Sequence, residues 1–210
     1  MVHYIFYYFS VRARGEPLRF LLYYSGVEFE DRHISLEEWP NLKKEMPFGQ
    51  LPALSVDGKI FSESSAIASF LGRRFGLSGK DDVEAARCDM LYQKVNDFIT
   101  TYLAPFIVAA VVENDKEKAD AMAKKNKEQG VISDFLKQFN DFLVQNGSGW
   151  FVGEKMTWVD ICIAEFTGRL EELFHPAVLN QFPPLKEHHR KIIELPNIKK
   201  YLANRKLMMY

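Results

Sequence analysis

The sequence has little cysteine, no long hydrophobic run and no excess of charge of either sign. Its two cysteines, Cys88 and Cys162, lie far apart, so they form neither a CxxC pair nor part of a metal-binding quartet, which suits a reducing compartment. The longest apolar stretch, residues 103–112, is about half a bilayer span and contains Pro105, which predicts a buried helix and no membrane helix. Because Lys and Arg number 27 and Asp and Glu 28, a nucleic-acid partner is not expected.

The beginning of the chain gives no sign of export. Residues 1–11 are apolar, but no basic residue precedes them, and Arg12, Arg14 and Glu16 stand where a small-residue cleavage site would be. With 47% hydrophobic and 26% charged residues in 210, the composition is that of a folded protein of one or two domains. We therefore expect a cytoplasmic globular protein.

The first 78 residues alternate strand-like and helix-like patterns. Gly15-Glu16-Pro17 begins a helix after the first strand, and another helix is expected from Ser64. Asp57-Gly58 between two short alternating runs is a strong hairpin signal. The expected strands are 3–9, 28–34, 53–56 and 59–62. Strands separated by a helix form a parallel pair with a right-handed crossover, so the pattern predicts a four-stranded mixed sheet of thioredoxin-like layout.

Strand patterns cease after a short polar connector, residues 79–82. Apolar residues at helical spacing predict two long amphipathic helices, and Pro105 is expected to kink the first. Thr157 and Asp160 form a capping box at the start of a third helix. Helices are therefore expected around 91–106, 132–143, from 157, 185–195 and 198–205. The fold class is α+β, with a thioredoxin-like domain over residues 1–78, a linker over 79–82 and an all-α helical bundle over 83–210.

The expected chemistry is that of a sulfur supplied by a ligand. A thioredoxin-like domain usually acts on sulfur, but the segment directly after the first strand contains no cysteine. Pro52 precedes the hairpin strand, where a cis bond would turn the backbone of Leu51 toward the open edge to pair with an extended peptide, although trans is the default for such bonds. The reactive thiol must therefore arrive with a bound peptide.

Several residue types suit the binding and activation of such a thiol. A phenol is a neutral hydrogen-bond donor at pH 7, and the first strand carries Tyr4, Tyr7 and Tyr8, but alternation does not decide which of them faces a ligand and packing explains each equally well. Ser64 at a helix start offers a hydroxyl and free N–H groups to a carboxylate, or serves only as a cap. His175, His188 and His189 fit no metal or triad pattern and are expected at the surface or at helix ends.

Short motifs recur in order along nearly the whole chain. They are Tyr8 in YYF, Arg12, Arg14, Gly15-Glu16, Glu38-Trp39, Lys43, PFGQLP at 47–52, Asp57-Gly58, ESSAIA at 63–68 and GEKMTWVD at 153–160. Each motif is weakly specific alone, but together they resemble sigma-class glutathione transferases, and most of all the nematode members of that class.

The resemblance implies a site for glutathione as co-substrate, with no metal. It selects Tyr8 and Arg14 as catalytic residues. The implied glutathione-binding residues are Tyr8, Trp39, Lys43, Gln50, Leu51, Pro52, Glu63, Ser64 and, from the second copy of a homodimer, Asp97. The pocket for the hydrophobic substrate is expected to draw on Phe9, Tyr102, Phe106, Trp158 and Tyr210, although for any one of them taken alone core packing is favoured.

The implied function is conjugation of the glutathione thiolate to hydrophobic electrophiles, as in xenobiotic metabolism and detoxification. Glu63 stands where many sigma-class members have Gln, which leaves its effect on the orientation of glutathione open. Asn96 and Lys94 beside Asp97 depart from the aspartate cluster that holds a divalent metal in the vertebrate prostaglandin-isomerase branch. A glutathione-dependent prostaglandin D isomerase and a non-catalytic carrier of hydrophobic or haem-like ligands remain the alternatives.

Overall fold

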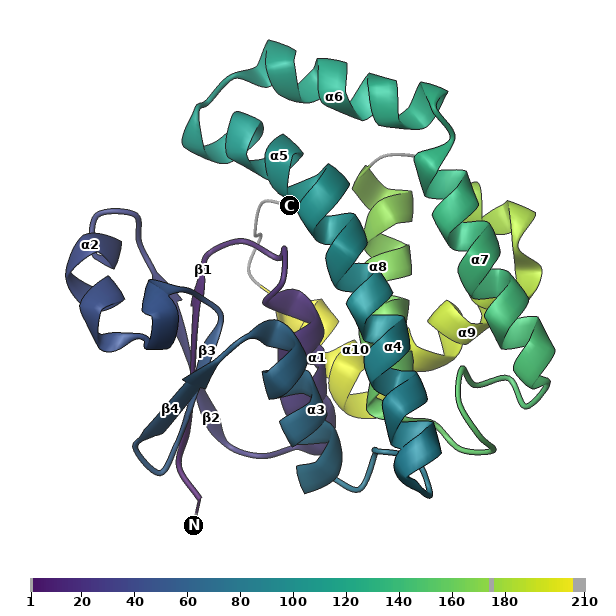
Figure 1. Ribbon diagram of the computed structural model, residues 1–210, viewed down its shortest axis with the longest axis horizontal. Coiled ribbons are helices and arrows are strands. Elements are labelled where there is room, and N and C mark those ends of the chain that lie inside the picture. The colour runs from purple at the N-terminus through teal and green to yellow at the C-terminus, as the bar shows by residue number, and fades with distance from the viewer. Residues whose placement is uncertain (1, 174–175, 206–210) are drawn as a thin grey trace.

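A four-stranded mixed sheet forms the core of the N-terminal part in the computed structural model, which describes residues 2–173 and 176–205 (Figure 1). The strands are β1 (Tyr4–Phe9), β2 (Phe29–Ile34), β3 (Ala53–Val56) and β4 (Lys59–Ser62), in the order β2-β1-β3-β4. β1 and β2 are parallel, and β3 is antiparallel to both of its neighbours. The predicted hairpin and parallel crossover are confirmed.

The two faces of the sheet have different helical cover. Tyr4, Phe6 and Tyr8 alternate onto the face that packs into the larger core, with α1 (Glu16–Ser25) and α3 (Ser64–Arg74). Tyr7 points to the other face, where it packs in a small cluster beneath α2 (Trp39–Leu42). Tyr8 is thus on the side of the sheet that meets the helical domain.

The C-terminal part is helical and packs around α8 (Trp158–Leu173), which contacts α1, α4 and α9. Buried residues occupy almost the whole circumference of α8, and most of them are apolar, as expected for a helix enclosed by others. The remaining helices are α4 (Asp82–Phe98), α5 (Ala104–Ile107), α6 (Lys116–Glu128), α7 (Val131–Asn146), α9 (Pro183–Ile193) and α10 (Pro196–Asn204). A thioredoxin-like domain followed by a helical domain is confirmed.

Pro105 lies between two π-helical turns, Ile99–Leu103 and Val108–Val112. In the first of these turns the N–H of Ala104 reaches the carbonyl of Ile99, so the helical ladder is already shifted where the proline lacks an N–H. The continuous stretch Asp82–Val112 is long and apolar enough to cross a membrane by length and composition. In this fold its first part, α4, packs against α3 and α8, and 39% of the apolar window is buried. The expected burial of residues 103–112 is only partial, since Val108 and Val112 are exposed.

Two features of the helical domain differ from the sequence-based expectation. α6 was not predicted, because its only buried residue is Ala119 and it therefore lacks an apolar stripe. His188 is buried, not exposed: it is 1% accessible and its Nε2 lies 3.0 Å from Oδ1 of Asp160. Half of the capping box is confirmed: the N–H of Thr157 donates to the Asp160 carboxylate at 2.7 Å, but the Thr157 hydroxyl donates to the same carboxylate at 2.8 Å instead of accepting a backbone N–H. His175 lies outside the described residues.

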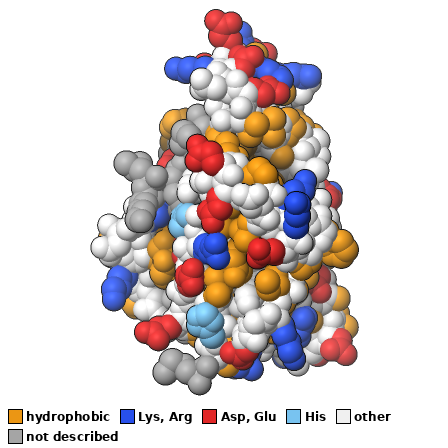
Figure 2. All heavy atoms as spheres, turned by 90° about the vertical axis from the view of Figure 1, so that its left-hand side faces the viewer, with side chains coloured by type: hydrophobic (Ala, Val, Ile, Leu, Met, Phe, Trp, Pro, Cys, Tyr) orange, Lys and Arg blue, Asp and Glu red, His pale blue; other side chains and the backbone are white. Residues whose placement is uncertain are grey.

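The surface carries charges of both signs side by side. Figure 2 shows acidic and basic side chains interspersed over the face on the sheet side, with apolar side chains between them. This mixed pattern agrees with the formal net charge of −1 and creates no broad field of one sign.

Candidate functional site

One edge of the sheet gathers the loops that carry the predicted site. Phe9 ends β1 opposite Ile34, the last residue of β2. Tyr7 lies opposite Ala53, the first residue of β3, and Ala53 lies opposite Ser62, the last residue of β4. The same edge of the sheet is therefore where the segments after β1, β2 and β4 begin and where the segment before β3 ends.

Tyr8 lies at this edge with its hydroxyl engaged as an acceptor. The backbone N–H of Arg14 donates to the Tyr8 oxygen at 3.1 Å, which leaves the phenolic hydrogen free to be donated. Burial raises the pKa of Tyr8 above its ordinary value, and the Arg14 N–H with the charges of Arg14, Arg169 and Arg19 oppose that rise. The raised pKa keeps Tyr8 protonated at neutral pH. Gly15 lies so close beneath the ring that a Cβ there would be 2.2 Å from Cδ1 of Tyr8.

The side chain of Arg14 reaches across to the helical domain. Its Nη2 donates to Oγ1 of Thr100 at 2.6 Å, and Thr100 in turn donates to the carbonyl of Asn96 at 2.7 Å. The guanidinium is thereby fixed at the end of α4, on the π-helical turn. π-helical turns often occur at functional sites because they reorient side chains, and this one presents Thr100 to the arginine.

Trp39 and Lys43 lie on the segment that follows β2. Trp39 begins α2 and packs edge-on against Phe9, with ring centroids 5.5 Å apart. The Lys43 chain passes over Gly49, where an added Cβ would come within 3.1 Å of Cε. Gln50 is exposed next to them. Lys43 thus lies against the 47–52 loop that carries Gln50, while Trp39 contacts the end of β1 through Phe9.

The Leu51-Pro52 peptide bond is cis, which the sequence had left open beside the trans default. Pro52 is buried and Leu51 is half-buried, directly before the start of β3. Leu51 therefore lies at the edge of the sheet where β1 ends.

The start of α3 combines free N–H groups with an unusual backbone. Glu63 precedes the helix with φ of 71°, in the left-handed region, and its side chain makes no capping hydrogen bond. Ser64 is buried and donates to Oδ1 of Asn96 at 3.2 Å, while Nδ2 of Asn96 donates to Ser65 at 2.9 Å. Ser64 is therefore not a plain side-chain cap, and the first N–H groups of α3 keep their capacity to bind an anion.

Asp97 lies on the exposed side of α4. Its Oδ1 accepts from Nε2 of Gln93 at 3.1 Å, and its Oδ2 lies 3.6 Å from Nζ of Lys94. The neighbouring Asn96 contacts Ser64 and Ser65 of α3 instead, so the two adjacent residues have different surroundings.

The aromatic residues predicted for the hydrophobic pocket divide into two groups. Phe9, Tyr102 and Phe106 lie on β1 and on the helix around Pro105, with Phe9 and Tyr102 half-buried and Phe106 7% exposed. Trp158 is 1% exposed and packs edge-on against Tyr92, so it belongs to the interior of the helical domain and does not line a cleft. Tyr210 lies outside the described residues.

Three residues that shape the site were not predicted as site residues from the sequence: Gly15, Asn96 and Thr100. Gly15 was noted as part of a helix start and of the Gly15-Glu16 motif but not as a site residue, although a glycine there permits the close approach of the tyrosine ring. Asn96 and Thr100 depend on the packing of α4 against the first domain. Among the described residues, no group of three His, Cys, Asp or Glu side chains gathers as a metal site.

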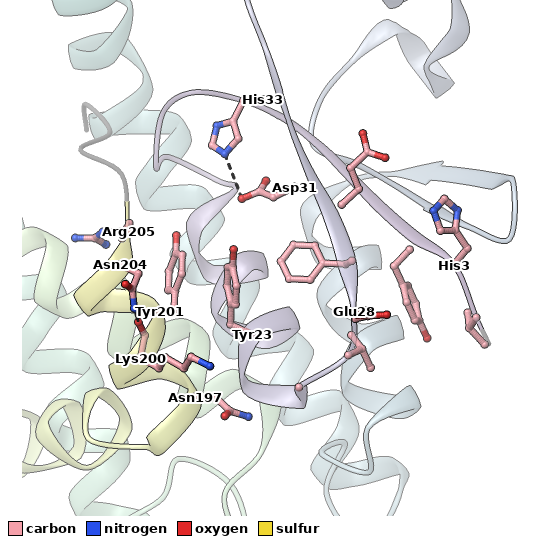
Figure 3. Close-up of a pocket in the computed structure, with 16 residues that line it drawn as sticks. His3, Tyr23, Glu28, Asp31, His33, Asn197, Lys200, Tyr201, Asn204 and Arg205 are labelled. Carbon is pink, nitrogen blue, oxygen red and sulfur yellow. Dashed lines mark hydrogen bonds and ion pairs between the residues drawn. The ribbon is translucent and has the colours of Figure 1, made fainter.

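A groove of about 1050 Å³ lies away from these residues, between β2 and α10 (Figure 3). Tyr23 and Tyr201 stack in it with ring centroids 4.1 Å apart, and His33 pairs with Asp31 at 3.2 Å. None of the residues predicted for the site lines this groove, and its walls carry both acidic and basic groups. The groove is therefore separate from the chemistry around Tyr8.

The chain matches two family models, described as Glutathione S-transferase, N-terminal domain, over residues 5–73, and Glutathione S-transferase, C-terminal domain, over residues 102–205. It is 38% identical to Glutathione S-transferase 1 of Ascaris suum over 209 residues, which are 98% of each chain. The structure of monomeric Na-GST-3, a glutathione S-transferase of the hookworm Necator americanus, matches with a TM-score of 0.88 at 32% identity, over 99% of this chain and 100% of that one. The prostaglandin synthase D of Nilaparvata lugens matches with a TM-score of 0.83 at 29% identity, over 98% and 100%.

Proposed function

Because the chain belongs to the glutathione S-transferase family, we propose that this enzyme stabilises the thiolate of glutathione with Tyr8 and conjugates it to hydrophobic electrophiles. The observation that carries the proposal is the Tyr8 hydroxyl, which accepts the Arg14 N–H and keeps its own hydrogen to donate. Burial raises the pKa of Tyr8, so the phenol remains a donor over the neutral range.

The energetics match one hydrogen bond. A free thiol has a pKa of about 8.5, and lowering it by about two units requires roughly 2.7 kcal/mol of preferential stabilisation of the anion. A hydrogen bond to a charged group contributes about 1.5–3 kcal/mol. One O–H from Tyr8 therefore supplies most of the activation, and Arg14 adds positive charge beside the sulfur.

The ends of glutathione find matching groups along the sheet edge. We assign the glycyl carboxylate to Lys43, Trp39 and Gln50; Lys43 passes over Gly49 of the 47–52 loop, and Trp39 begins the helix that leads to Lys43. Backbone pairing at Leu51, with Pro52 after it, holds the cysteinyl residue as an added strand pairs with a sheet edge.

The γ-glutamyl carboxylate is assigned to Ser64 and the free N–H groups of α3, with the exposed Glu63 carboxylate placed to meet the α-ammonium. The electrophile then lies against Phe9, Tyr102 and Phe106. For the domains we retain the boundaries 1–78, 79–82 and 83–210.

We propose further that the enzyme is a cytoplasmic homodimer of the sigma class, acting in the detoxification of xenobiotics. Phe48 protrudes with 83% of its surface exposed, and Met90 is 48% exposed in a shallow hollow between α3 and α4. A two-fold interface that buries both features also brings Asp97 of the partner subunit, on the same helix as Met90, toward the start of α3. Because the hookworm relative Na-GST-3 is described as monomeric, the oligomeric state of this protein is the quantity to measure.

Replacing Phe48 tests the assembly. Phe48→Ser removes the protruding ring and is expected to shift sedimentation from dimer to monomer at micromolar concentration. The matched control is Val144→Ser on α7, an apolar side chain that is 56% exposed away from the proposed interface. A Phe48→Ser protein that sediments like the wild type contradicts the proposed interface.

Replacing Tyr8 tests the reaction. Tyr8→Phe is expected to lower kcat/KM for glutathione with a chlorodinitrobenzene by roughly ten- to a hundredfold, from the loss of one hydrogen bond to a thiolate. The matched control is Tyr7→Phe, a buried tyrosine of the same strand on the other face, which should retain the wild-type rate. An unchanged rate in Tyr8→Phe rejects the assigned role.

A glutathione-dependent prostaglandin isomerase is the second candidate, favoured by the structural match to prostaglandin synthase D of Nilaparvata lugens. The same thiolate would serve, but glutathione would be regenerated in each cycle. Incubation with a prostaglandin endoperoxide and analysis of product stereochemistry separates the two: isomerisation without consumption of glutathione supports the second candidate, and a glutathione adduct supports the first.

A further inference from the structure

The peptide group between Ala13 and Arg14 contacts both Tyr8 and the helical domain, and it lies in the turn that follows β1. The turn between β1 and α1 is closed by the N–H groups of Gly15 and Glu16, which both donate to the carbonyl of Arg12, at 2.9 and 2.8 Å. Within it Ala13 has φ of 30°, in the left-handed region that a residue with a Cβ rarely adopts. The turn therefore needs support from outside itself to keep this shape.

That support comes from Arg169 on α8. Its Nη1 donates to the carbonyl oxygen of Ala13 at 2.6 Å, and its Nη2 donates to Oε2 of Glu165 at 3.1 Å. Arg169 is 1% exposed, and its guanidinium lies over the ring of Phe166, with Cζ 5.3 Å from the ring centroid. The guanidinium is thus held by two residues of its own helix, Glu165 and Phe166, in addition to its contact with the turn.

The carbonyl of Ala13 and the N–H of Arg14 belong to the same peptide unit. A trans peptide is planar, with its C=O and N–H pointing in opposite directions, so an arginine that fixes the oxygen also fixes the direction of the hydrogen. That hydrogen is the one directed at the Tyr8 oxygen, at an N···O distance of 3.1 Å. A charged donor on the carbonyl also polarises the peptide and strengthens its N–H, because hydrogen bonds in a chain reinforce one another.

We propose that Arg169 is a positioning residue for the activation of glutathione: its guanidinium holds and polarises the 13–14 peptide, whose N–H orients the Tyr8 hydroxyl toward the thiolate. The inference rests on the proposed role of Tyr8 and adds to it a residue of the other domain. The hydrogen bonds run from the guanidinium to the Ala13 carbonyl, from the Arg14 N–H to the Tyr8 oxygen, and from the Tyr8 O–H to the sulfur.

Arg12 provides a matched control. It is buried in the same turn and is tied to the same helix, since its Nη1 donates to Glu172 at 2.7 Å. Arg12 does not bond to the 13–14 peptide in the described contacts, so Arg12→Met loosens the turn without removing the guanidinium from the Ala13 carbonyl. A residue that merely ties the turn to α8 and one that acts through the peptide are thereby distinguished.

The experiment measures the pKa of the enzyme-bound glutathione thiol, from thiolate ultraviolet absorbance and from the pH profile of kcat/KM. Because removal of Arg169 alone would leave Glu165 buried without its partner, Arg169→Met is made in the Glu165→Gln background and compared with Glu165→Gln. We expect a higher thiol pKa and a loss of kcat/KM on the order of tenfold at pH 6.5, with KM for glutathione nearly unchanged. If the double variant does not fold, Arg169→Gln is measured in the same Glu165→Gln background, and because glutamine retains a neutral donor, a smaller rise of the thiol pKa in the same direction is expected.

Two results overturn the inference: a thiol pKa in the folded Arg169 variant equal to that of its background, or an equal rise in Arg12→Met. A Tyr8→Phe background separates this failure from that of the proposed function. If Tyr8→Phe leaves the thiol pKa unchanged, the proposed role of Tyr8 fails. If Tyr8→Phe raises it and the Arg169 substitution does not, only the role of Arg169 fails. The expected result is that Arg169→Met has no further effect once Tyr8 is Phe.

Discussion

The substitution Gly15→Ala adds a single methyl group, and its effects on the unfolding free energy and on kcat/KM can be measured separately. An ideal Cβ at this position lies 2.2 Å from Cδ1 and 2.8 Å from Cε1 of Tyr8. Carbon atoms in contact are separated by about 3.5–4.0 Å, so in Gly15→Ala the ring must move by more than about 1 Å. The backbone of Gly15, with φ of −82° and ψ of −34°, itself tolerates alanine. The whole effect therefore acts through the tyrosine.

The expected magnitude follows from that displacement. Overpacking of a buried site typically costs about 1–3 kcal/mol of unfolding free energy. A reacting group displaced by about 1 Å costs roughly a hundredfold in rate, and the same displacement takes the Tyr8 oxygen from the Arg14 N–H. Urea unfolding at fixed protein concentration measures the first quantity, and kcat/KM with a chlorodinitrobenzene, corrected for the folded fraction, measures the second.

Gly72 supplies the matched control, since an ideal Cβ there lies 2.2 Å from Cδ1 of Trp158, in the interior. Gly72→Ala is expected to destabilise the fold by a similar amount, about 1–3 kcal/mol, but to leave kcat/KM of the folded protein near the wild-type value. A Gly15→Ala enzyme with wild-type kcat/KM refutes the reasoning, and so does a Gly72→Ala enzyme that is equally impaired per folded molecule.

The sheet could be predicted almost completely from the sequence because its signals are local. The Asp57-Gly58 turn fixes the register of the hairpin, and Gly26 ends α1 in the left-handed conformation that glycine adopts readily. α6 could not be predicted, because a helix with one buried residue has no periodic apolar stripe. Local patterns also did not decide whether the bond before Pro52 is cis or which face of the sheet Tyr8 occupies.

The site itself depends on helix packing that local patterns do not contain. The contact of Asn96 with Ser64 joins residues 32 positions apart, and that of Arg169 with Ala13 joins residues 156 apart. Both contacts require the rotation of α4 and α8 about their axes, which is set when the helices pack. Trp158 shows the reverse error: an aromatic residue at a helix start suits a pocket or a core equally well, and packing against Tyr92 places it in the core.

Two further predictions concern buried carboxylates of α8. Asp160 accepts from the N–H groups of Thr157 and Phe151 and bonds to His188. Asp160→Ala is therefore expected to lower the unfolding free energy, measured by urea titration, by about 3–5 kcal/mol. The control is the exposed helix cap Asp81, where Asp81→Ala should cost about 1 kcal/mol; equal losses in the two variants contradict the prediction. Burial raises the pKa of Glu165 from 4.5 to about 7, so in the folded state it holds a proton that the unfolded chain releases earlier as the pH rises. The stability from this group is thus fully present below pH 4.5 and is lost as the pH rises through 7. Between pH 5 and 8 the wild type should lose about 2–3 kcal/mol more unfolding free energy than Glu165→Gln, whose amide does not ionise, and parallel pH curves for the two proteins would show that the carboxyl titrates normally.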